Sequence, residues 1–382
     1  MSLPTHHLYV HVPVCRLVCA YCDFVTVGGR GSDVAHYPDA LLAEMALRPA
    51  SGQLATVYFG GGTPSLLPAE GVGRLVTAAV ERWGSAPTEV TLEANPSSRE
   101  TPDWAGLRAA GVNRISLGIQ SLRDAELRAL ARGQTAAEGR AAFAAVRGAG
   151  FANASIDLIY GIPGQSLADW REGLYAGLSL EPDHLSLYAL QLALAPDEWA
   201  APPRPGALRW RQRMVLRQDD GLAAAQYELA EELLDAAGFV HYELSSWARP
   251  GFESRHNSAY WERRLYTGIG AGAHSFDGAS RSWNQRDLDG YLARTKAGER
   301  ALAGSEQLDE PTRAFEAIAL GLRRVAGFSR SDFAGEFGQD PVERFAGAFQ
   351  EGAGLLEIGA DSIRLTPRGR LFANEALVAF AP

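Results

Sequence analysis

The stretch HVPVCRLVCAYCDF, residues 11–24, places three cysteines within eight residues, directly after a predicted strand at residues 8–12. Cys15, Cys19 and Cys22 are the only cysteines of the 382-residue chain. An odd number of thiols cannot all pair within one chain, and a reducing compartment keeps such closely spaced thiols reduced. The spacing therefore favours a metal or cluster site over a disulfide framework.

The two candidate sites are an iron–sulfur cluster and a structural zinc ion. Three thiolates hold three irons of a [4Fe–4S] cluster and leave the fourth iron open to an exchangeable ligand. Zinc normally takes four ligands, often from paired cysteine elements, and the chain has no second pair of cysteines. His11, four positions before Cys15, is the candidate fourth zinc ligand. The ligand count favours the cluster.

Short apolar runs alternate with helical segments over the first half of the chain. The expected strands lie at residues 8–12, 56–59, 89–93, 114–118, 154–159 and 184–190, and clear helical spacing appears at residues 72–83, 124–131 and 136–149. This alternation predicts an α/β fold with a parallel sheet, either a partial TIM-type barrel of six β/α units or an open doubly wound sheet. In a barrel, the cysteine loop lies at the mouth where active sites form.

The second half of the chain is more irregular. A proline-rich break at residues 195–205 precedes a predicted long helix at residues 208–237 and a loop-rich region at residues 241–285. Three helices, a hairpin at residues 355–358 and 362–365 and a final helix then predict a small winged-helix-like domain. We therefore expect two domains, residues 1–300 and 301–382, the second with a packing or lid role.

Several predicted strands end on glycine or on a single polar residue. The strand at residues 56–59 runs into the glycine-rich run at residues 60–63, and glycine allows close backbone approach to a ligand. Later strands close on Glu93, Gln120 and Asp157. Each residue alone fits a turn or a helix cap equally well. Because the carboxyl ends of barrel strands meet at one mouth, we expect them to converge on a polar ligand.

The C-x3-C-x2-C motif, with Tyr21 before the third cysteine, resembles that of the radical S-adenosylmethionine superfamily. The strings LEANP, RISLGIQS, LARGQ and DLIYGIPGQ resemble one family within it, which contains the oxygen-independent coproporphyrinogen III dehydrogenases and the HemW-type haem chaperones. The resemblance covers nearly the whole chain. It implies a partial (β/α)6 barrel, a [4Fe–4S] cluster on Cys15, Cys19 and Cys22, and S-adenosylmethionine as a cofactor.

The resemblance also assigns individual residues. Those that it places at the S-adenosylmethionine site are Tyr9, Phe24, Gly60, Gly61, Gly62, Thr63, Glu93, Gln120, Arg132, Asp157 and Ile269. Arg132 would pair with a carboxylate, and Glu93 and Asp157 would accept hydrogen bonds from ribose or amino groups. Gln134 departs from the pattern, because the family often has histidine two places after the arginine.

Two functions compete within this family. The dehydrogenases resemble C-x3-C-x2-C-x-C, and Phe24 stands at the place of the fourth cysteine. They also carry a longer N-terminal extension, whereas this chain begins fourteen residues before Cys15. We therefore expect no oxidative decarboxylation of coproporphyrinogen III, which stays the alternative function. A radical reaction on another substrate is a third hypothesis, and cleavage of S-adenosylmethionine is compatible with each.

The HNSAYW stretch, residues 256–261, matches the HNxxYW motif of the HemW group. The resemblance implies a chaperone that delivers haem to an acceptor protein, either soluble or membrane-associated, with haem at His256, Asn257, Tyr260 and Trp261. Neutral imidazole is a good axial ligand of haem iron, and aromatic rings offer a flat apolar surface beside a porphyrin. His274, in the glycine-rich run that follows, is a spare candidate ligand.

Net charge and hydropathy restrict the partners and the cellular location that we expect for this protein. The formal net charge of −9 argues against a nucleic-acid partner, because phosphate contacts need a basic surface. No apolar run reaches the length of a transmembrane helix, and the first residues lack the pattern of a secretory signal. We expect a cytoplasmic protein.

Overall fold

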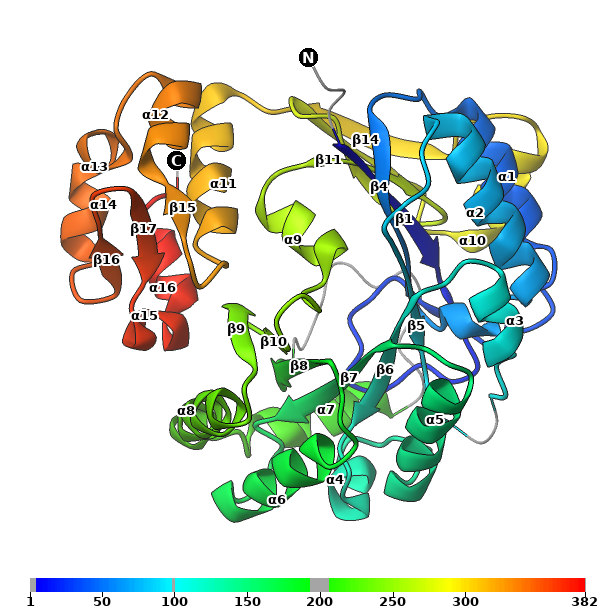
Figure 1. The fold of residues 1–382 in the computed structure, drawn as a ribbon, viewed down its shortest axis with the longest axis horizontal. Helices are drawn as coiled ribbons and strands as arrows, with labels where there is room; N and C mark the ends of the chain where they lie inside the picture. The colour runs from blue at the N-terminus through cyan, green and yellow to red at the C-terminus, as the bar shows by residue number, and fades with distance from the viewer. Residues whose placement is uncertain (1–4, 98–99, 193–205, 382) are drawn as a thin grey trace.

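A twelve-stranded sheet forms the main body of the structure, which is a computed structural model that describes residues 5–97, 100–192 and 206–381 (Figure 1). Seven central strands are parallel, in the order β11 (Leu265–Ile269), β1 (Thr5–Val12), β4 (Gln53–Gly61), β5 (Glu89–Ala94), β6 (Arg114–Gln120), β7 (Asn153–Tyr160) and β8 (His184–Ala189). Antiparallel strands extend the two edges: β12 (His274–Phe276), β13 (Ser280–Asn284) and β14 (Leu302–Gln307) beside β11, and β10 (Ser246–Ala248) and β9 (Val240–Glu243) beside β8. The sheet is curved and open, which is the shape of a partial barrel.

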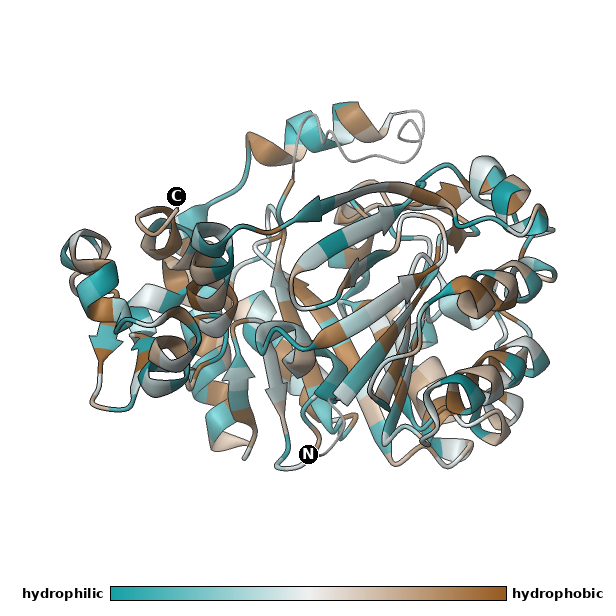
Figure 2. Ribbon diagram, turned by 90° about the horizontal axis from the view of Figure 1, so that it is seen from above, coloured by the Kyte–Doolittle hydropathy of each residue, from teal (hydrophilic) through white to brown (hydrophobic). Residues whose placement is uncertain are grey.

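Helices cover the outer face of this sheet. They are α1 (Tyr37–Leu47), the 3₁₀ turn η1 (Pro64–Leu66), α2 (Ala69–Trp83), α3 (Trp104–Ala109), α4 (Asp124–Ala129), α5 (Ala136–Gly148), α6 (Leu167–Leu178), α8 (Asp220–Ala236) and α10 (Leu288–Lys296). In contrast, α7 (Ala207–Val215) contacts the cysteine loop, where Arg211 donates to the carbonyls of Ala20 and Cys22. Capping boxes start α5 at Thr135 and α6 at Ser166. Figure 2 shows hydrophobic residues in the central strands and hydrophilic residues on the outer helices. None of the described helices is long and apolar enough to span a membrane.

The side chains of the sheet alternate between an apolar outer face and a polar inner face. On β4, Val57 and Phe59 belong to the main hydrophobic core, whereas Thr56 and Tyr58 make polar contacts on the opposite face. Tyr58 donates a hydrogen bond of 2.7 Å to Glu93 on the neighbouring strand β5. Because successive residues of a strand point to opposite sides, this alternation gives the partial barrel a hydrophilic interior.

A short helix, α9 (Arg255–Trp261), lies on this inner face (Figure 1). Its backbone amides at Arg255 and His256 donate hydrogen bonds to the carboxylate of Glu89, at the start of β5. The side chain of Ser254 caps the helix by accepting from the amide of Asn257. The carboxylate at the helix N-terminus therefore fixes the HNSAYW segment against the sheet.

The C-terminal part of the chain has its own hydrophobic core. It contains α11 (Glu310–Gly321), β15 (Phe328–Ser329), α12 (Arg330–Phe337), α13 (Pro341–Arg344), α14 (Ala346–Glu351), β16 (Leu356–Ile358), β17 (Ser362–Leu365), α15 (Pro367–Leu371) and α16 (Ala373–Val378). The three strands form a small antiparallel sheet in the order β15–β17–β16. Several contacts join this part to the barrel. They include the hydrogen bond from the amide of Leu244 to the carbonyl of Arg323 and the ion pairs of Arg263 with Glu336 and of Arg370 with Glu231.

The predicted α/β fold is confirmed, and all six expected strands are present as β1 and β4 to β8. The prediction of one long helix at residues 208–237 is wrong, because the structure has two helices there, α7 and α8. Asp219 accepts from the amide of Leu222 and starts a second helix there. The proline-rich break at residues 195–205 lies outside the described residues, and the domain division at residue 300 stays a prediction.

The region 241–285 also differs from the loop-rich segment expected from the sequence. It contains α9 and five strands or parts of strands, and β11 extends the parallel sheet beside β1. The sequence did not predict this strand, because the segment is rich in glycine. At Gly268 an added Cβ would lie 2.0 Å from the carbonyl oxygen of His274, so close pairing of β11 with the following strand requires glycine.

Candidate functional site

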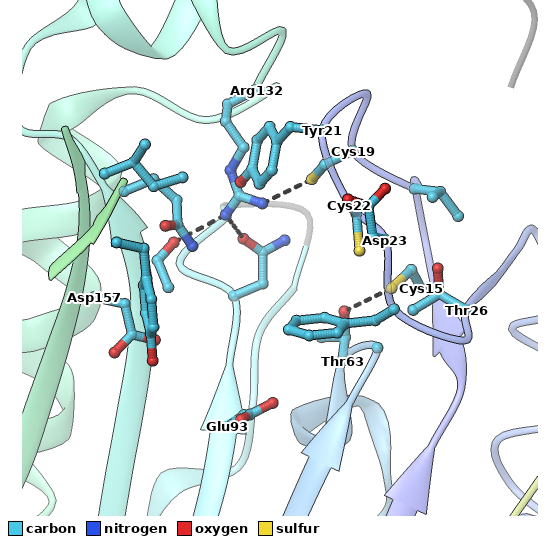
Figure 3. A pocket seen from close by; sticks show the side chains of 18 of the residues that line it. Cys15, Cys19, Tyr21, Cys22, Asp23, Thr26, Thr63, Glu93, Arg132 and Asp157 are labelled. Carbon is cyan, nitrogen blue, oxygen red and sulfur yellow. Dashed lines mark hydrogen bonds between the residues drawn. The ribbon is translucent and has the colours of Figure 1, made fainter. Parts of the chain in front are cut away.

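A cavity of about 340 Å³ opens at the carboxyl ends of the parallel strands (Figure 3). The loop after β1, part of which forms the short parallel pair β2 (Val14–Cys15) and β3 (Val27–Gly28), supplies one wall. Figure 3 shows Cys15, Cys19 and Cys22 along this wall, with Glu93 and Asp157 on the strand side of the cavity. The sequence motif and the strand ends therefore meet in one place.

The three thiols are part-buried and face the same cavity. Thr63 Oγ1 lies 3.5 Å from the sulfur of Cys15, and Arg132 Nη1 lies 2.9 Å from the sulfur of Cys19. Burial raises the pKa of Cys15 to about 12 and the pKa of Cys22 to about 11. The thiolate forms need a positively charged partner at neutral pH, and the irons of a cluster are such a partner. The donor set fits a [4Fe–4S] cluster with one open iron.

The surroundings of His11 do not fit the zinc alternative. Its Nδ1 lies 3.0 Å from the hydroxyl of Tyr9, and its Nε2 lies 2.8 Å from the carbonyl of Val25. Both ring nitrogens are thus engaged away from the thiols.

Arg132 is held in place by four acceptors. Besides the sulfur of Cys19, its guanidinium donates to Asn95 Oδ1, to the carbonyl of Gly118 and to Gln134 Oε1, at 2.7, 2.9 and 2.8 Å. Gln134 in turn donates to the carbonyl of Ile119 at 2.7 Å. The glutamine that departs from the family pattern therefore orients the arginine.

Two residues near Arg132 have left-handed backbone conformations. The φ angles of Gln120 and Ala131 are 68° and 54°, and neither residue is glycine. Gln120 lines the cavity and follows a register shift between β6 and β7. Such strain is stored at functional sites when the surrounding structure enforces it.

Glu93 and Asp157 are acidic groups in an enclosed setting. Burial raises the pKa of Glu93 to about 7, although hydrogen bonds from Tyr58 and the amide of Gly61 oppose the shift. Burial likewise raises the pKa of Asp157 to about 6, opposed by hydrogen bonds from Ser186 and Ser116. Both carboxyls therefore change charge within the physiological pH range.

The glycine-rich run at residues 60–63 packs against the chain after β1 and also lines the cavity. Gly61 and Gly62 line the cavity, and Gly61 has a φ of 110°. An added Cβ would lie 2.5 Å from the ring of His11 at the first position and 2.8 Å from the backbone of Pro13 at the second. Larger residues would displace the chain that leads from β1 into the cysteine loop.

A second cavity, of about 550 Å³, adjoins the first on the inner face of the barrel. The residues that line both cavities are Asp23, Phe24, Gly61, Glu93 and Tyr188. Asn257, Tyr260 and Trp261 of α9 line the second cavity, together with His274, Arg286 and Arg323. The HNSAYW segment therefore faces a space beside the thiols, not the thiol cavity itself.

His256 does not line either cavity and is 0% exposed. Its Nδ1 lies 2.6 Å from Thr56 Oγ1, and its Nε2 lies 2.9 Å from the hydroxyl of Tyr260. The ring also stacks on Tyr58, with 5.0 Å between the ring centroids. Burial lowers the pKa of His256 well below its usual value, so the imidazole is neutral.

The residues assigned from the sequence fall into three groups. Those at the first cavity are Cys15, Cys19, Cys22, Phe24, Gly61, Gly62, Thr63, Glu93, Gln120, Arg132 and Asp157. Tyr9, Asn257, Tyr260 and Trp261 lie at the second cavity, which Phe24, Gly61 and Glu93 share, whereas Gly60, His256 and Ile269 lie at neither. Gly60 leaves room for the rings of Tyr9 and Tyr58, and Ile269 is a core residue.

Sequence reasoning missed several lining residues. Tyr188 at the end of β8 and Asn95 after β5 line the first cavity, and the strand pattern could have found both. Arg286 and Arg323 line the second cavity. No sequence pattern predicts that these two arginines lie at one site. Arg286 follows an edge strand, and Arg323 comes from the C-terminal part of the chain.

Comparisons with known proteins agree with this architecture. Residues 9–174 match the family model of the Radical SAM superfamily, and residues 308–372 match the HemN C-terminal domain. The solved structure of coproporphyrinogen III oxidase (HemN) from Escherichia coli covers 99% of this chain and 90% of its own length, with a TM-score of 0.82. Because the sequence identity is 23%, this likeness is evidence of a shared fold alone.

Several curated relatives are similar over almost their whole length. The heme chaperone HemW of Mycobacterium tuberculosis is 37% identical, with 96% of this chain and 92% of the relative covered. The heme chaperone HemW of Escherichia coli is 32% identical, with 100% of this chain and 99% of the relative covered. The chain therefore belongs to the HemW family of the radical SAM superfamily.

Proposed function

We propose that this protein is a haem carrier, which binds haem and delivers it to an acceptor protein. It holds a [4Fe–4S] cluster on Cys15, Cys19 and Cys22 and binds S-adenosylmethionine in the first cavity. The observation that carries the proposal is the second cavity, where Asn257, Tyr260 and Trp261 meet beside the thiol site. The relatives named heme chaperones support it.

The first cavity has groups suited to a cationic, zwitterionic cofactor. The open iron of the cluster supplies the electron and the ligand position for S-adenosylmethionine. Glu93 and Asp157 offer carboxylate acceptors to its amino and ribose groups, and Arg132 offers a guanidinium to its carboxylate. Gly61 and Gly62 allow close backbone approach, and Tyr21 and Phe24 supply ring surface that excludes water.

The position two residues after Cys22 favours the carrier over the dehydrogenase. Phe24 is 67% exposed and lines both cavities, so an aromatic ring occupies the boundary where the enzymes of the family place a fourth cysteine. Phenylalanine has no thiol, so this position cannot supply a fourth thiolate to a metal or a cofactor. This departure supports haem binding without turnover of a porphyrinogen.

The proposed setting is the cytoplasm, with an acceptor that is soluble or bound to a membrane. The acid-rich chain is unsuited to a nucleic-acid partner, since its formal net charge is −9. Haem is itself the cargo, and the cluster and S-adenosylmethionine are the resident groups.

A turnover assay separates the carrier from the enzyme. The anaerobically reconstituted protein is incubated with coproporphyrinogen III, S-adenosylmethionine and a reductant, and porphyrins are resolved by chromatography. The proposal predicts no protoporphyrinogen, while the same preparation binds haem. Formation of protoporphyrinogen over many turnovers would contradict it and make the protein a dehydrogenase.

A cysteine variant tests whether the two sites are separate. Cys19→Ser should abolish the cluster absorbance, because three thiolates are needed to hold three irons. Haem binding should persist, since the second cavity contains none of the three cysteines. Complete loss of haem binding by a folded Cys19→Ser protein would show that the sites are interdependent.

A further inference from the structure

The second cavity has the size and chemistry of a ligand site. Its volume of about 550 Å³ lies within the usual range for pockets of small organic ligands. Seven phenylalanine, tyrosine and tryptophan side chains contribute to its walls: Tyr9, Phe24, Tyr58, Tyr188, Tyr260, Trp261 and Tyr266. A large planar molecule would gain extensive apolar contact there.

Polar atoms in the same walls have no partner among the described residues. Trp261 Nε1, Arg323 Nε and Glu243 Oε2 are buried and make no hydrogen bond there. Buried polar groups normally find partners, so these three atoms of lining residues are exceptions. The pattern points to a ligand that carries polar groups at its edge.

The charges of the cavity favour an anionic ligand. Arg286 and Arg323 both line it, and the guanidinium of Arg323 lies 4.4 Å from the ring centroid of Trp261. The carboxylate of Asp23 is paired with Arg211 at 2.6 Å. Glu243 also lines the cavity, and burial raises its pKa above the usual value of a glutamate.

The geometry of α9 separates the roles of His256 and Tyr260. They are one helical turn apart, and the tyrosine reaches the cavity whereas the histidine lies behind it. Both nitrogens of His256 are engaged, one by Thr56 and one by the hydroxyl of Tyr260. Of this pair, Tyr260 is therefore the residue that a ligand in the cavity contacts.

A buried chain of hydrogen bonds continues behind this pair. Thr56 Oγ1 also lies 2.8 Å from Nδ1 of His7, so His7, Thr56, His256 and Tyr260 form one row. The row can be oriented with every donor pointing toward the tyrosine oxygen. In that orientation His256 donates from Nε2 and stabilises a phenolate.

We propose that the second cavity binds an iron tetrapyrrole with two carboxylates, with Tyr260 as the iron ligand and Arg286 and Arg323 at the carboxylates. His256 is a positioning residue that acts through the hydroxyl of Tyr260. This proposal rests on the haem binding proposed above. Tyrosine is an established axial ligand of haem iron. On coordination the phenol loses its proton to the buffer, and His256 stays hydrogen-bonded to the remaining oxygen.

The test is an anaerobic titration of the full-length protein with ferric haem, followed by visible absorbance and electron paramagnetic resonance. Tyr260→Phe should remove the phenolate-to-iron charge-transfer band and weaken binding by roughly tenfold or more. Tyr175→Phe is the matched control, because Tyr175 is an exposed tyrosine of α6 away from the cavity. It should leave the spectrum and the affinity unchanged.

Variants of His256 distinguish positioning from ligation. His256→Ala should shift the charge-transfer band and weaken binding. His256→Gln should restore the band, because the amide can donate to the same phenol oxygen. A low-spin imidazole spectrum in the wild type that is lost in both variants would overturn the proposal and make His256 the ligand.

The arginines and His274 complete the experiment. Arg286→Ala and Arg323→Ala should each weaken haem binding several-fold, and the exposed Arg294→Ala should not. An unchanged spectrum in Tyr260→Phe, or loss of the wild-type spectrum in His274→Ala alone, would overturn the assignment while leaving the haem carrier intact. Absence of saturable haem binding in the wild type would instead refute the proposed function.

Discussion

Thr56 Oγ1 lies 2.6 Å from Nδ1 of His256, which joins the parallel sheet to the first residue of the HNxxYW motif. Both side chains are buried, and the same hydroxyl also contacts His7. The histidine of the motif is thus part of the interior of the barrel. Its ring orientation follows from a strand residue that no motif contains.

Replacement of Thr56 by valine should therefore destabilise the fold. The substitution leaves Nδ1 of His7 and Nδ1 of His256 without a partner, which costs about 1–3 kcal/mol in the free energy of unfolding. Urea denaturation of the wild type and the variant measures this difference. Thr88→Val, at an exposed threonine before β5, is the control and should change stability little. Equal midpoints for all three proteins would contradict the buried network.

Glu44 of α1 should be among the most sensitive positions outside the cavities. Its buried carboxylate accepts from Arg48, the amide of Gly270, Asn284 and Tyr291, so it fixes the turn after β11. Glu44→Ala leaves Arg48 buried without its charge partner, which should cost about 3–5 kcal/mol. The loss is measured by thermal and urea unfolding. The exposed Glu81→Ala serves as the reference, and a similar small effect for both would refute this role.

The affinity for S-adenosylmethionine should depend on pH through Glu93 and Asp157. Burial raises their pKa values to about 7 and about 6, so both carboxyls become protonated as the pH falls through this range. Protonation removes the negative charges that the proposed function assigns to binding of the cationic cofactor. Binding to the reconstituted protein should therefore weaken from about pH 8 to about pH 6.

Equilibrium dialysis at several pH values measures this dependence. Glu93→Gln should weaken binding and remove most of the pH dependence above about pH 6.5. Glu172→Gln, at an exposed carboxylate of α6, should retain it. A wild-type affinity that is constant over this range would show that neither carboxyl contacts the cofactor.

The break between α7 and α8 gives a local prediction. Asp219 caps α8, whereas Asp220 is the first residue inside the helix. Asp219→Ala should lower the free energy of unfolding by about 0.5–2 kcal/mol. Asp220→Ala removes the same charge without removing the cap, so it should cost only a few tenths of a kcal/mol, as an exposed charge near a helix end does. Reversed magnitudes in urea denaturation would contradict the assigned cap.

The strand pattern and the cysteine motif made the barrel and its mouth predictable. Each of β4 to β8 is a short apolar run bounded by polar or glycine residues, and periodicity alone identifies such runs. Glu93, Gln120 and Asp157 line one cavity and belong to neighbouring parallel strands. Glu93 and Gln120 lie at the ends of β5 and β6, whereas Asp157 lies within β7. Local pattern and global fold agree along this half of the chain.

The second cavity was not predictable in the same way. Its walls combine Tyr9 from β1, Tyr260 from α9, Arg286 after β13 and Arg323 after α11, which are distant in sequence. Likewise, the HNxxYW motif marked His256 as a ligand on chemical grounds, whereas its burial depends on contacts with β4. Tertiary contacts of this kind leave no local periodicity.

The most direct measurement of the central claim is an equilibrium titration of the anaerobically reconstituted wild-type protein with haem, followed by absorbance. The account predicts saturable binding that reaches a plateau at a single equivalent per chain, with a spectrum distinct from that of free haem. A linear, unsaturable increase that matches free haem would contradict the account, because a carrier must hold its cargo at a defined site.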